Sequence, residues 1–153
     1  MTDMNIELAR HNMIEQQIRP WDVLDQRVLD VILRTPRELY VPPAHHALAF
    51  TDMPIPLGHD QYMMEPRLEG RMLQSLAIKP SDRVLEIGTG SGYVTAMLAS
   101  LAKHVDSVDI VAEFTESARE KLNKHGVANV KLETGDASKG WNLSTAAEKL
   151  QKV

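Results

Sequence analysis

Three short apolar segments each contain or precede an acidic residue. Glycines come directly after the first segment. Glu86 lies in the stretch VLEIGTGSGYVTAMLA at residues 84–99, Asp109 ends the segment 105–109, and Asp136 comes after the segment 130–134. In an open parallel sheet the carboxyl ends of the strands meet at one edge, where α/β proteins bind their ligands. If these segments are such strands, the three acids lie along one crevice.

The glycines Gly88, Gly90 and Gly92 have the spacing G-x-G-x-G. A dinucleotide fingerprint, G-x-G-x-x-G, would place its last glycine where this chain has Tyr93, and a phosphate-binding P-loop would end in Gly-Lys-Ser or Gly-Lys-Thr, which is absent here. Taken alone, the glycines are equally compatible with a plain strand-to-helix turn whose neighbouring acids are solvent-facing caps.

The acids favour one ligand chemistry. A carboxylate at Glu86, just before the loop, repels a pyrophosphate and suits a cationic ligand. Asp109 can accept hydrogen bonds from both hydroxyls of a ribose, and Gly135–Asp136 lies at the edge of the same crevice. A ligand with an amino group, a ribose and an adenine but no phosphate is S-adenosylmethionine, which we predict as the cofactor.

The elements that must position these residues are predicted from residue 83 onward as strand, helix, strand, helix, strand. Gly126 stands where the second helix must end in a left-handed backbone. This alternation predicts an α/β fold with parallel strands and helices on the faces. With the predicted cofactor, the expected type is a Rossmann-like sheet that resembles that of class I methyltransferases.

Before residue 80 the pattern predicts an N-terminal helical extension. Residues 6–18 form a loose helical stripe, and residues 68–76 form a helix that stops near Lys79 and Pro80. A cleaner stripe is capped by Asp25 and stopped by Pro36. Its apolar members are Leu24, Val28, Leu29, Ile32 and Leu33. Between this stripe and the helix of residues 68–76, the prolines of residues 40–66 exclude regular helix and require turns or extended chain.

These patterns divide the chain into three parts of one structural unit. Residues 1–80 are the extension with an acceptor-site loop, residues 81–141 are the first half of the Rossmann-like domain, and residues 142–153 are a short tail. In the tail, a short helix from Leu143 to Leu150 is expected, with Thr145 and Glu148 as a capping box.

Composition narrows the class of protein. The 153 residues have a formal net charge of −4 and include no cysteine, which excludes disulfides, thiolate nucleophiles and Cys-bound zinc. Lysine and arginine do not cluster, so nucleic acid is not an expected partner. The scattered histidines predict no metal site. Without a secretory signal or a long apolar run, a cytoplasmic protein without membrane contact is expected.

Two further groups of residues are interpreted structurally. Trp21 and Trp141 are expected to be packing anchors. The charged run on the helix before Gly126 is expected to be its solvated face. This run comprises Glu116, Arg119, Glu120, Lys121 and Lys124.

From about Met13 to Trp141 the chain resembles protein-L-isoaspartate O-methyltransferases. The matching phrases include MIEQQIRP, TPRELYVP, AFTDMPIPLGHDQ, LEIGTGSGY and GDASKGW. The glycine loop is shared by many class I methyltransferases, whereas PRELYVP and the D-x-P-I-P-L-G-x-x-Q pattern are more specific to this family.

The resemblance implies protein repair. Such enzymes methylate the free α-carboxylate of isoaspartyl residues in damaged proteins, and the ester collapses to a succinimide that can reopen as aspartate. The donor-binding residues implied are Glu86, Gly88, Thr89, Gly90, Gly92, Asp109, Ile110, Asp136 and Ala137. The acceptor-side candidates implied are Gly58, His59, Gln61 and Met64. No residue is assigned as a catalytic base, because a carboxylate is already ionised at neutral pH.

The acceptor loop departs from the family pattern G-x-G-Q-T-I-S-x-P. This chain has Asp60 for the second glycine, then Tyr62, Met63 and Met64 for Thr, Ile and Ser. A thioether cannot donate the hydrogen bond that the family's serine makes. Either the methionines only pack against the extension, or the methyl acceptor differs from isoaspartate.

The predicted strands are also fewer than the seven of a methyltransferase fold, so the C-terminal strands are expected to be absent and the first strand is expected to have an unpaired edge. The alternatives are a truncated chain, a naturally short protein, or a sheet completed by a second chain. The first two correspond to a monomer and the third to a dimer. We favour truncation, with weak activity or none, and a donor-binding fragment without catalysis remains a rival interpretation.

Overall fold

A computed structural model describes residues 3–143 of the chain. The chain divides into two compact units, Met1–Ala77 and Ile78–Val153, close to the boundary expected at residue 80. Each unit is described by itself, and their union into one structural body stays a prediction. The helix expected from Leu143 to Leu150 lies outside the described residues apart from its first residue.

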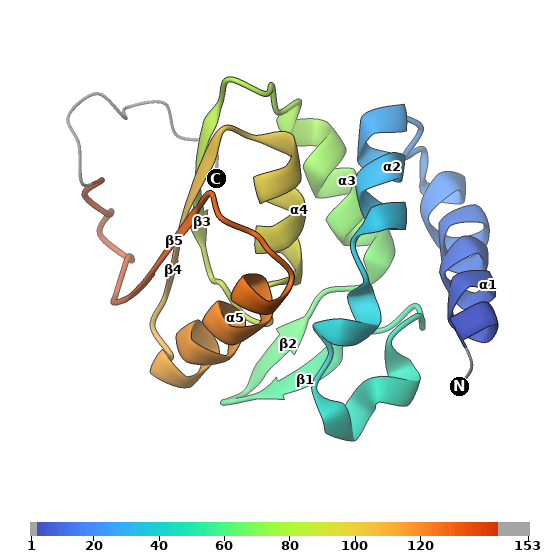
Figure 1. The fold of residues 1–153 in the computed structure, drawn as a ribbon, viewed down its shortest axis with the longest axis horizontal. Helices are drawn as coiled ribbons and strands as arrows, with labels where there is room; N and C mark the ends of the chain where they lie inside the picture. The colour runs from blue at the N-terminus through green and yellow to red at the C-terminus, as the bar shows by residue number, and fades with distance from the viewer. Residues whose placement is uncertain (1–2, 144–153) are drawn as a thin grey trace. The chain divides into compact units, whose positions relative to one another are not determined.

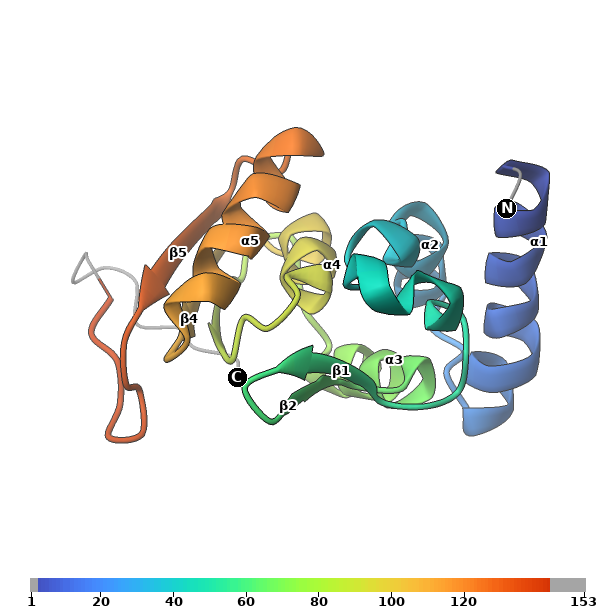
Figure 2. The same cartoon turned by 90° about the horizontal axis from the view of Figure 1, so that it is seen from below.

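The second unit has the predicted alternation of strands and helices. A parallel sheet in the order β3-β4-β5 alternates along the chain with two helices. Both α4 and α5 lie on the same face of this sheet (Figure 1, Figure 2), as two right-handed crossovers in one direction require. The bounds are β3 Arg83–Ile87, α4 Tyr93–Leu101, β4 His104–Asp109, α5 Ala112–Lys124 and β5 Val130–Thr134.

Apolar residues of both helices pack against the strands. The buried residues of this core include Val84, Ala96, Met97, Leu98, Val105, Val108, Phe114, Ala118 and Leu122. The end of α5 follows the prediction, because Gly126 has φ 72° and its N–H donates to the carbonyl of Asn123 at 3.2 Å. Among the described strands β3 is an edge strand, as expected.

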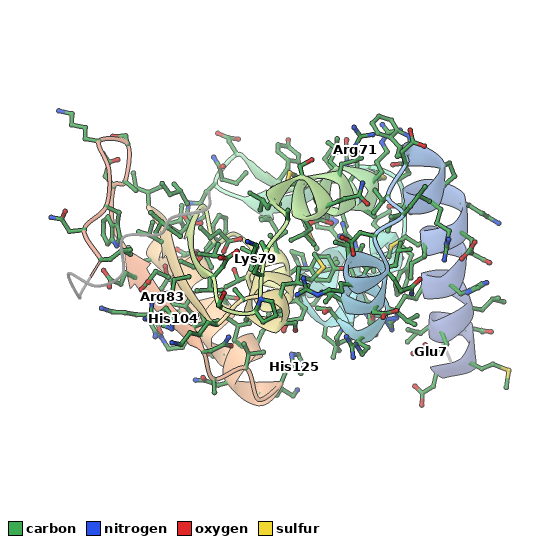
Figure 3. All side chains as sticks on the ribbon, turned by 90° about the horizontal axis from the view of Figure 1, so that it is seen from above. Glu7, Arg71, Lys79, Arg83, His104 and His125 are labelled. Atoms are coloured by element: carbon green, nitrogen blue, oxygen red, sulfur yellow. The ribbon has the colours of Figure 1, made fainter. Side chains whose placement is uncertain are left out.

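The register places the site-forming ends of the strands side by side. Ile87 pairs with Val108, and Asp109 pairs with Thr134. The amino ends lie at the opposite edge, where Arg83 pairs with His104 (Figure 3). The carboxyl edge therefore brings together the three loops that begin after Ile87, Asp109 and Thr134.

The first unit consists of helices and a hairpin (Figure 1). The chain that the prolines keep from regular helix forms short 3₁₀ turns and the antiparallel pair β1–β2. The helical elements are α1 Asp3–Met13, the π-helix η1 Ile14–Ile18, the 3₁₀-helices η2 Arg19–Trp21, η3 Arg37–Leu39 and η4 Pro43–Leu48, and the α-helices α2 Gln26–Arg34 and α3 Pro66–Leu76. The hairpin strands are β1 Ile55–Gly58 and β2 Gln61–Met63.

The start of α2 confirms one local prediction and corrects another. Asp25 is the N-cap, and its carboxylate accepts hydrogen bonds from the N–H of Arg27 at 2.9 Å and of Val28 at 3.4 Å. Leu24 and Leu33, however, are 63% and 46% exposed, so their place in the buried stripe was wrong. Leu24 precedes the N-cap and lies outside the helix. Leu33 comes one position after the buried Ile32 and lies on the side of the helix that faces away from the core.

Membrane insertion finds no support in the described helices, since none of them has the length and apolar character to cross a bilayer.

Candidate functional site

The glycine loop between β3 and α4 has a backbone that only glycine adopts readily. Gly88, Gly90 and Gly92 have φ of 98°, 54° and 86°. The N–H of Gly88 donates to the carbonyl of Val108 at 2.8 Å, and the N–H of Gly92 donates to the carbonyl of Thr89 at 3.0 Å. The first bond extends the β3–β4 ladder by one residue, and the second closes a turn. The loop is therefore shaped before any ligand binds.

Asp109 joins the end of β4 to this loop. Its Oδ2 accepts a hydrogen bond from the N–H of Gly90 at 2.9 Å, and its Oδ1 accepts one from the N–H of Val111 at 2.9 Å. Two carboxylate oxygens have about four lone-pair sites, so two acceptor positions remain for a ligand. The sequence placed Asp109 beside the loop correctly, and the structure adds the backbone contacts that orient it.

Glu86 has a different environment from the one the sequence suggested. Instead of reaching into the loop, its buried carboxyl group accepts hydrogen bonds through Oε1 from Thr95 of α4 at 2.5 Å and from Ser107 of β4 at 2.6 Å. The Ser107 hydroxyl is also 2.6 Å from that of Thr89. Glu86 is thus linked to the glycine loop through Ser107 and Thr89.

The pKa of Glu86 is raised from 4.5 to about 7, chiefly by burial. The hydrogen bonds from Ser107 and Thr95 oppose this shift, and the negative charge of Asp109 adds to it. At neutral pH this carboxyl group therefore exchanges between its protonated and ionised forms.

The end of β5 reaches the same edge. The N–H of Gly135 donates to the carbonyl of Asp109 at 2.9 Å. Asp136 is exposed, and hydrogen bonds from Ser138 lower the pKa of its carboxyl group. Asp136 also lines an open cavity of about 420 Å³. The other lining residues are Lys139, Gly140, Trp141 and Asn142.

Trp141 packs against the backbone at Gly135, as expected of a packing anchor. A Cβ atom at Gly135 would lie only 2.5 Å from the Trp141 ring, so the indole requires glycine there. Ala137 accepts a hydrogen bond from the N–H of Gly140 at 3.0 Å. Ile110, which follows Asp109, is 69% exposed, and its side chain offers an apolar surface at the edge of the sheet.

In the first unit, the hairpin β1–β2 carries three of the acceptor-side candidates, and the fourth, Met64, follows it directly. Gly58, His59 and Asp60 all have positive φ, at 92°, 53° and 56°. Gln61 donates to the carbonyl of His59 at 3.4 Å. Met64 is 38% exposed and follows β2. The left-handed backbone at residue 60 is the physical reason why a glycine suits that position, which aspartate fills here.

Comparison with known proteins decides the family. The sequence model of the protein-L-isoaspartate(D-aspartate) O-methyltransferase family matches residues 8–148. The chain belongs to this family. The resemblance inferred from the sequence is thereby confirmed.

Curated relatives of the family are similar over most of this chain. A protein-L-isoaspartate O-methyltransferase of Aeropyrum pernix is 43% identical over 136 residues, which cover 86% of this chain and 52% of the relative. One from Gloeobacter violaceus is 40% identical over 129 residues, covering 84% and 63%. The chain thus spans about half to two thirds of the length of these relatives.

Solved structures of the methyltransferase family share the fold. A Plasmodium falciparum protein assigned as a protein-L-isoaspartate O-methyltransferase, in complex with S-adenosyl-L-homocysteine, has a TM-score of 0.66 and 19% identity, covering 84% of this chain and 62% of that one. Another protein-L-isoaspartate O-methyltransferase has a TM-score of 0.69 and 23% identity, covering 84% and 42%. Both confirm the α/β methyltransferase architecture.

Arg37, in the family phrase PRELYVP, is a residue whose role the sequence did not reveal. It is fully buried and pairs with the buried Glu69 of α3. Its guanidinium also donates to the carbonyl of Ala49 at 2.7 Å and to the carbonyl of Met64 at 2.9 Å. Arg37 therefore anchors the segment that follows the hairpin β1–β2. The occurrence of an arginine and a glutamate inside the family phrase PRELYVP was the available signal.

Lys121 of α5 corrects the prediction that its charged run is wholly solvated. Its ammonium donates to the carbonyl of Ser91 in the glycine loop at 3.2 Å, and burial lowers the pKa of the lysine. The other four residues of the run are exposed, as predicted. Because a lysine stem is long, its head can reach a neighbouring loop from a position that the helical pattern assigns to the surface.

Metal binding has no support among residues 3–143, where His, Asp and Glu side chains nowhere gather in a group of three that could hold an ion.

Proposed function

We propose that this chain binds S-adenosylmethionine at the glycine loop and transfers its methyl group to the free carboxylate of L-isoaspartyl residues in damaged proteins. The observation that carries the proposal is the hydrogen bond from Gly90 to Asp109. It places a carboxylate with remaining acceptor capacity beside a preformed glycine loop, in a chain of the isoaspartate methyltransferase family.

The residues present fit such a donor. A Cβ atom at Gly88 would meet nothing within 4 Å, so there is open space beside the loop. Asp109 keeps acceptor positions for ribose hydroxyls after binding its two backbone donors. The exposed apolar Ile110 provides a surface for a flat ring. No lysine-bearing phosphate loop competes with this assignment.

Each donor-side residue then has a role. S-adenosylmethionine, when bound, supplies a methyl group on a positively charged sulfur. Gly88, Gly90 and Gly92 let the backbone approach it, and Asp109 binds the ribose. Ile110, Asp136 and Ala137 border the adenine. The carboxyl group of Glu86 is buried, and its hydrogen bonds with Ser107 and Thr95 support the loop from inside the fold.

The acceptor side needs positioning rather than acid–base chemistry. An isoaspartyl α-carboxylate is ionised at pH 7, so its oxygen can form the bond to the methyl carbon without a base. Transfer would break the bond from that carbon to the donor's sulfur, leave the electron pair on sulfur and release no proton. Gly58, His59, Gln61 and Met64 of the hairpin segment are proposed to position the acceptor, so that alignment lowers the barrier.

Two assays test the proposal. Calorimetric titration with S-adenosylhomocysteine is expected to show one binding site. In a methylation assay with paired Asp and isoAsp peptides, transfer by this chain is expected to be weak and confined to the isoAsp peptide. Failure to bind S-adenosylhomocysteine, with binding of NAD or ATP instead, would refute the proposed donor site.

Two rival functions are separated by the same assays. A different acceptor is motivated by Tyr62 and Met64, which are 62% and 38% exposed at positions where the family has Thr and Ser. In that case S-adenosylhomocysteine binds and neither peptide is methylated, whereas another carboxylate is. A donor-binding module is motivated by the 52% coverage of the Aeropyrum pernix relative, and it would bind the product while methylating no acceptor.

A further inference from the structure

The peptide group between Ser91 and Gly92 is held at both of its polar ends. Its N–H, on Gly92, donates to the carbonyl of Thr89 at 3.0 Å. Its carbonyl, on Ser91, accepts from the ammonium of Lys121 at 3.2 Å. The first contact comes from the loop itself, whereas the second comes from α5, which lies after the next strand in the chain.

A peptide group next to glycine needs such a restraint. Gly90 has φ 54° and Gly92 has φ 86°, and glycine populates positive and negative φ almost equally. Rotation of the Ser91–Gly92 peptide is therefore inexpensive for the backbone. It would turn the carbonyl of Ser91 away from α5 and change the direction of the chain where it enters α4.

We propose that Lys121 is a positioning residue for methyl-donor binding, because its ammonium fixes the Ser91–Gly92 peptide and with it the binding shape of the glycine loop. This inference rests on the proposed donor site. Lys121 acts through the loop and is not assigned any contact with the donor. The lysine suits this role because its half-buried stem leaves its head little freedom to turn away.

The test compares three variants of the full chain. Lys121→Met keeps an unbranched stem and removes the donor, so the Kd for S-adenosylhomocysteine is expected to rise about threefold to tenfold, the effect of one lost hydrogen bond. Lys121→Arg retains an N–H donor and is expected to restore affinity to within about twofold of the native value. Lys124→Met, an exposed lysine on the same helix, is expected to leave the Kd unchanged.

A second measurement does not depend on ligand binding. Amide hydrogen exchange in the unliganded chain is expected to be faster at Gly90 and Gly92 in Lys121→Met than in Lys124→Met, while the amides of β4 exchange at native rates. If the native chain binds no S-adenosylhomocysteine, the proposed function fails and exchange alone decides whether Lys121 fixes the loop.

The positioning role is overturned if Lys121→Met keeps both the native Kd and the native exchange rates in the loop. It is also overturned if Lys121→Arg loses as much affinity as Lys121→Met, because the stem rather than the hydrogen bond would then be responsible.

Discussion

Asp109 and Glu86 carry the same functional group in different surroundings. Asp109 accepts hydrogen bonds from two backbone N–H groups at the edge of the sheet. Glu86 is enclosed between β4 and α4 by two hydroxyl donors, and burial raises its pKa to about 7. At the residue scale, one carboxylate is therefore ready to bind a ligand and the other supports the loop.

Replacing Asp109 by Asn tests the first role. The amide oxygen of asparagine can still accept a hydrogen bond from one of the two backbone N–H groups. Its NH₂ group faces the second N–H, which is left unpaired at a cost of about 1–3 kcal/mol. We expect the Kd for S-adenosylhomocysteine to rise at least about tenfold, as measured by calorimetry. The matched control is Asp106→Asn, a buried carboxylate of the same strand that pairs with His104. Equal losses of affinity in both variants would contradict the role of Asp109.

Replacing Glu86 by Gln tests the second role through pH. Because the folded-state pKa of about 7 lies above the ordinary 4.5, the folded protein binds more protons than the unfolded chain between these values. Its stability therefore falls as pH rises through this window, by at most about 1.4 kcal/mol per pH unit.

A glutamine does not titrate, so Glu86→Gln is expected to gain up to about 3 kcal/mol relative to the native chain between pH 4.5 and pH 8. Urea unfolding at several pH values measures the difference in free energy of unfolding between the two chains. Burial also raises the pKa of Glu69 to about 7, but Glu69 is present in both chains, so the difference reports on Glu86. The exposed Glu120→Gln serves as control. A difference between Glu86→Gln and the native chain that stays constant with pH would rule out titration of Glu86.

At the scale of elements, Arg37 joins three segments of the first unit. It pairs with Glu69 of α3 and donates to the carbonyls of Ala49, after η4, and Met64, after β2. A single buried guanidinium thus fixes the chain on both sides of the hairpin that carries the acceptor-side candidates.

Removing this guanidinium with Arg37→Leu leaves the Glu69 carboxylate buried without its partner, which costs about 3–5 kcal/mol. The double variant Arg37→Leu/Glu69→Leu buries no charge and is expected to regain part of that loss. Urea unfolding followed by circular dichroism compares the two variants. If the double variant is less stable than Arg37→Leu, the buried charge is not the origin of the loss.

At the scale of the whole molecule, the proposed donor-binding residues all belong to the unit Ile78–Val153, and the acceptor-side candidates belong to Met1–Ala77. Binding of S-adenosylhomocysteine should therefore act first on the second unit. A ligand that binds only the folded state stabilises it by about 2.7 kcal/mol at a free concentration 100 times its Kd.

We expect hydrogen-exchange protection at that ligand concentration to be strongest at residues 86–92 and 109–110. Mass spectrometry of proteolytic fragments measures it, with ATP at the same concentration as control. Protection concentrated in residues 3–77 would show that the donor site was assigned to the wrong unit.

The sequence by itself determined the features that depend on local chemistry. The α/β alternation follows from apolar periodicity, the Asp25 cap and the Gly126 helix end follow from the backbone groups they satisfy, and the proximity of Asp109 to the glycine loop follows from the geometry of parallel strands. Each needs only neighbouring residues or the rule that strand ends meet at one edge.

Only the tertiary structure decided where the charged side chains point. Three contacts of charged side chains join different elements: Glu86 bonds to Ser107, Lys121 bonds to Ser91, and Arg37 pairs with Glu69. The partners are 21 to 32 residues apart in the chain. Periodicity assigns a residue to a face of its own element, but it does not identify the partner that packing brings there. For that reason the sequence could name the residues of the loop, while the structure shows which contacts hold the loop in place.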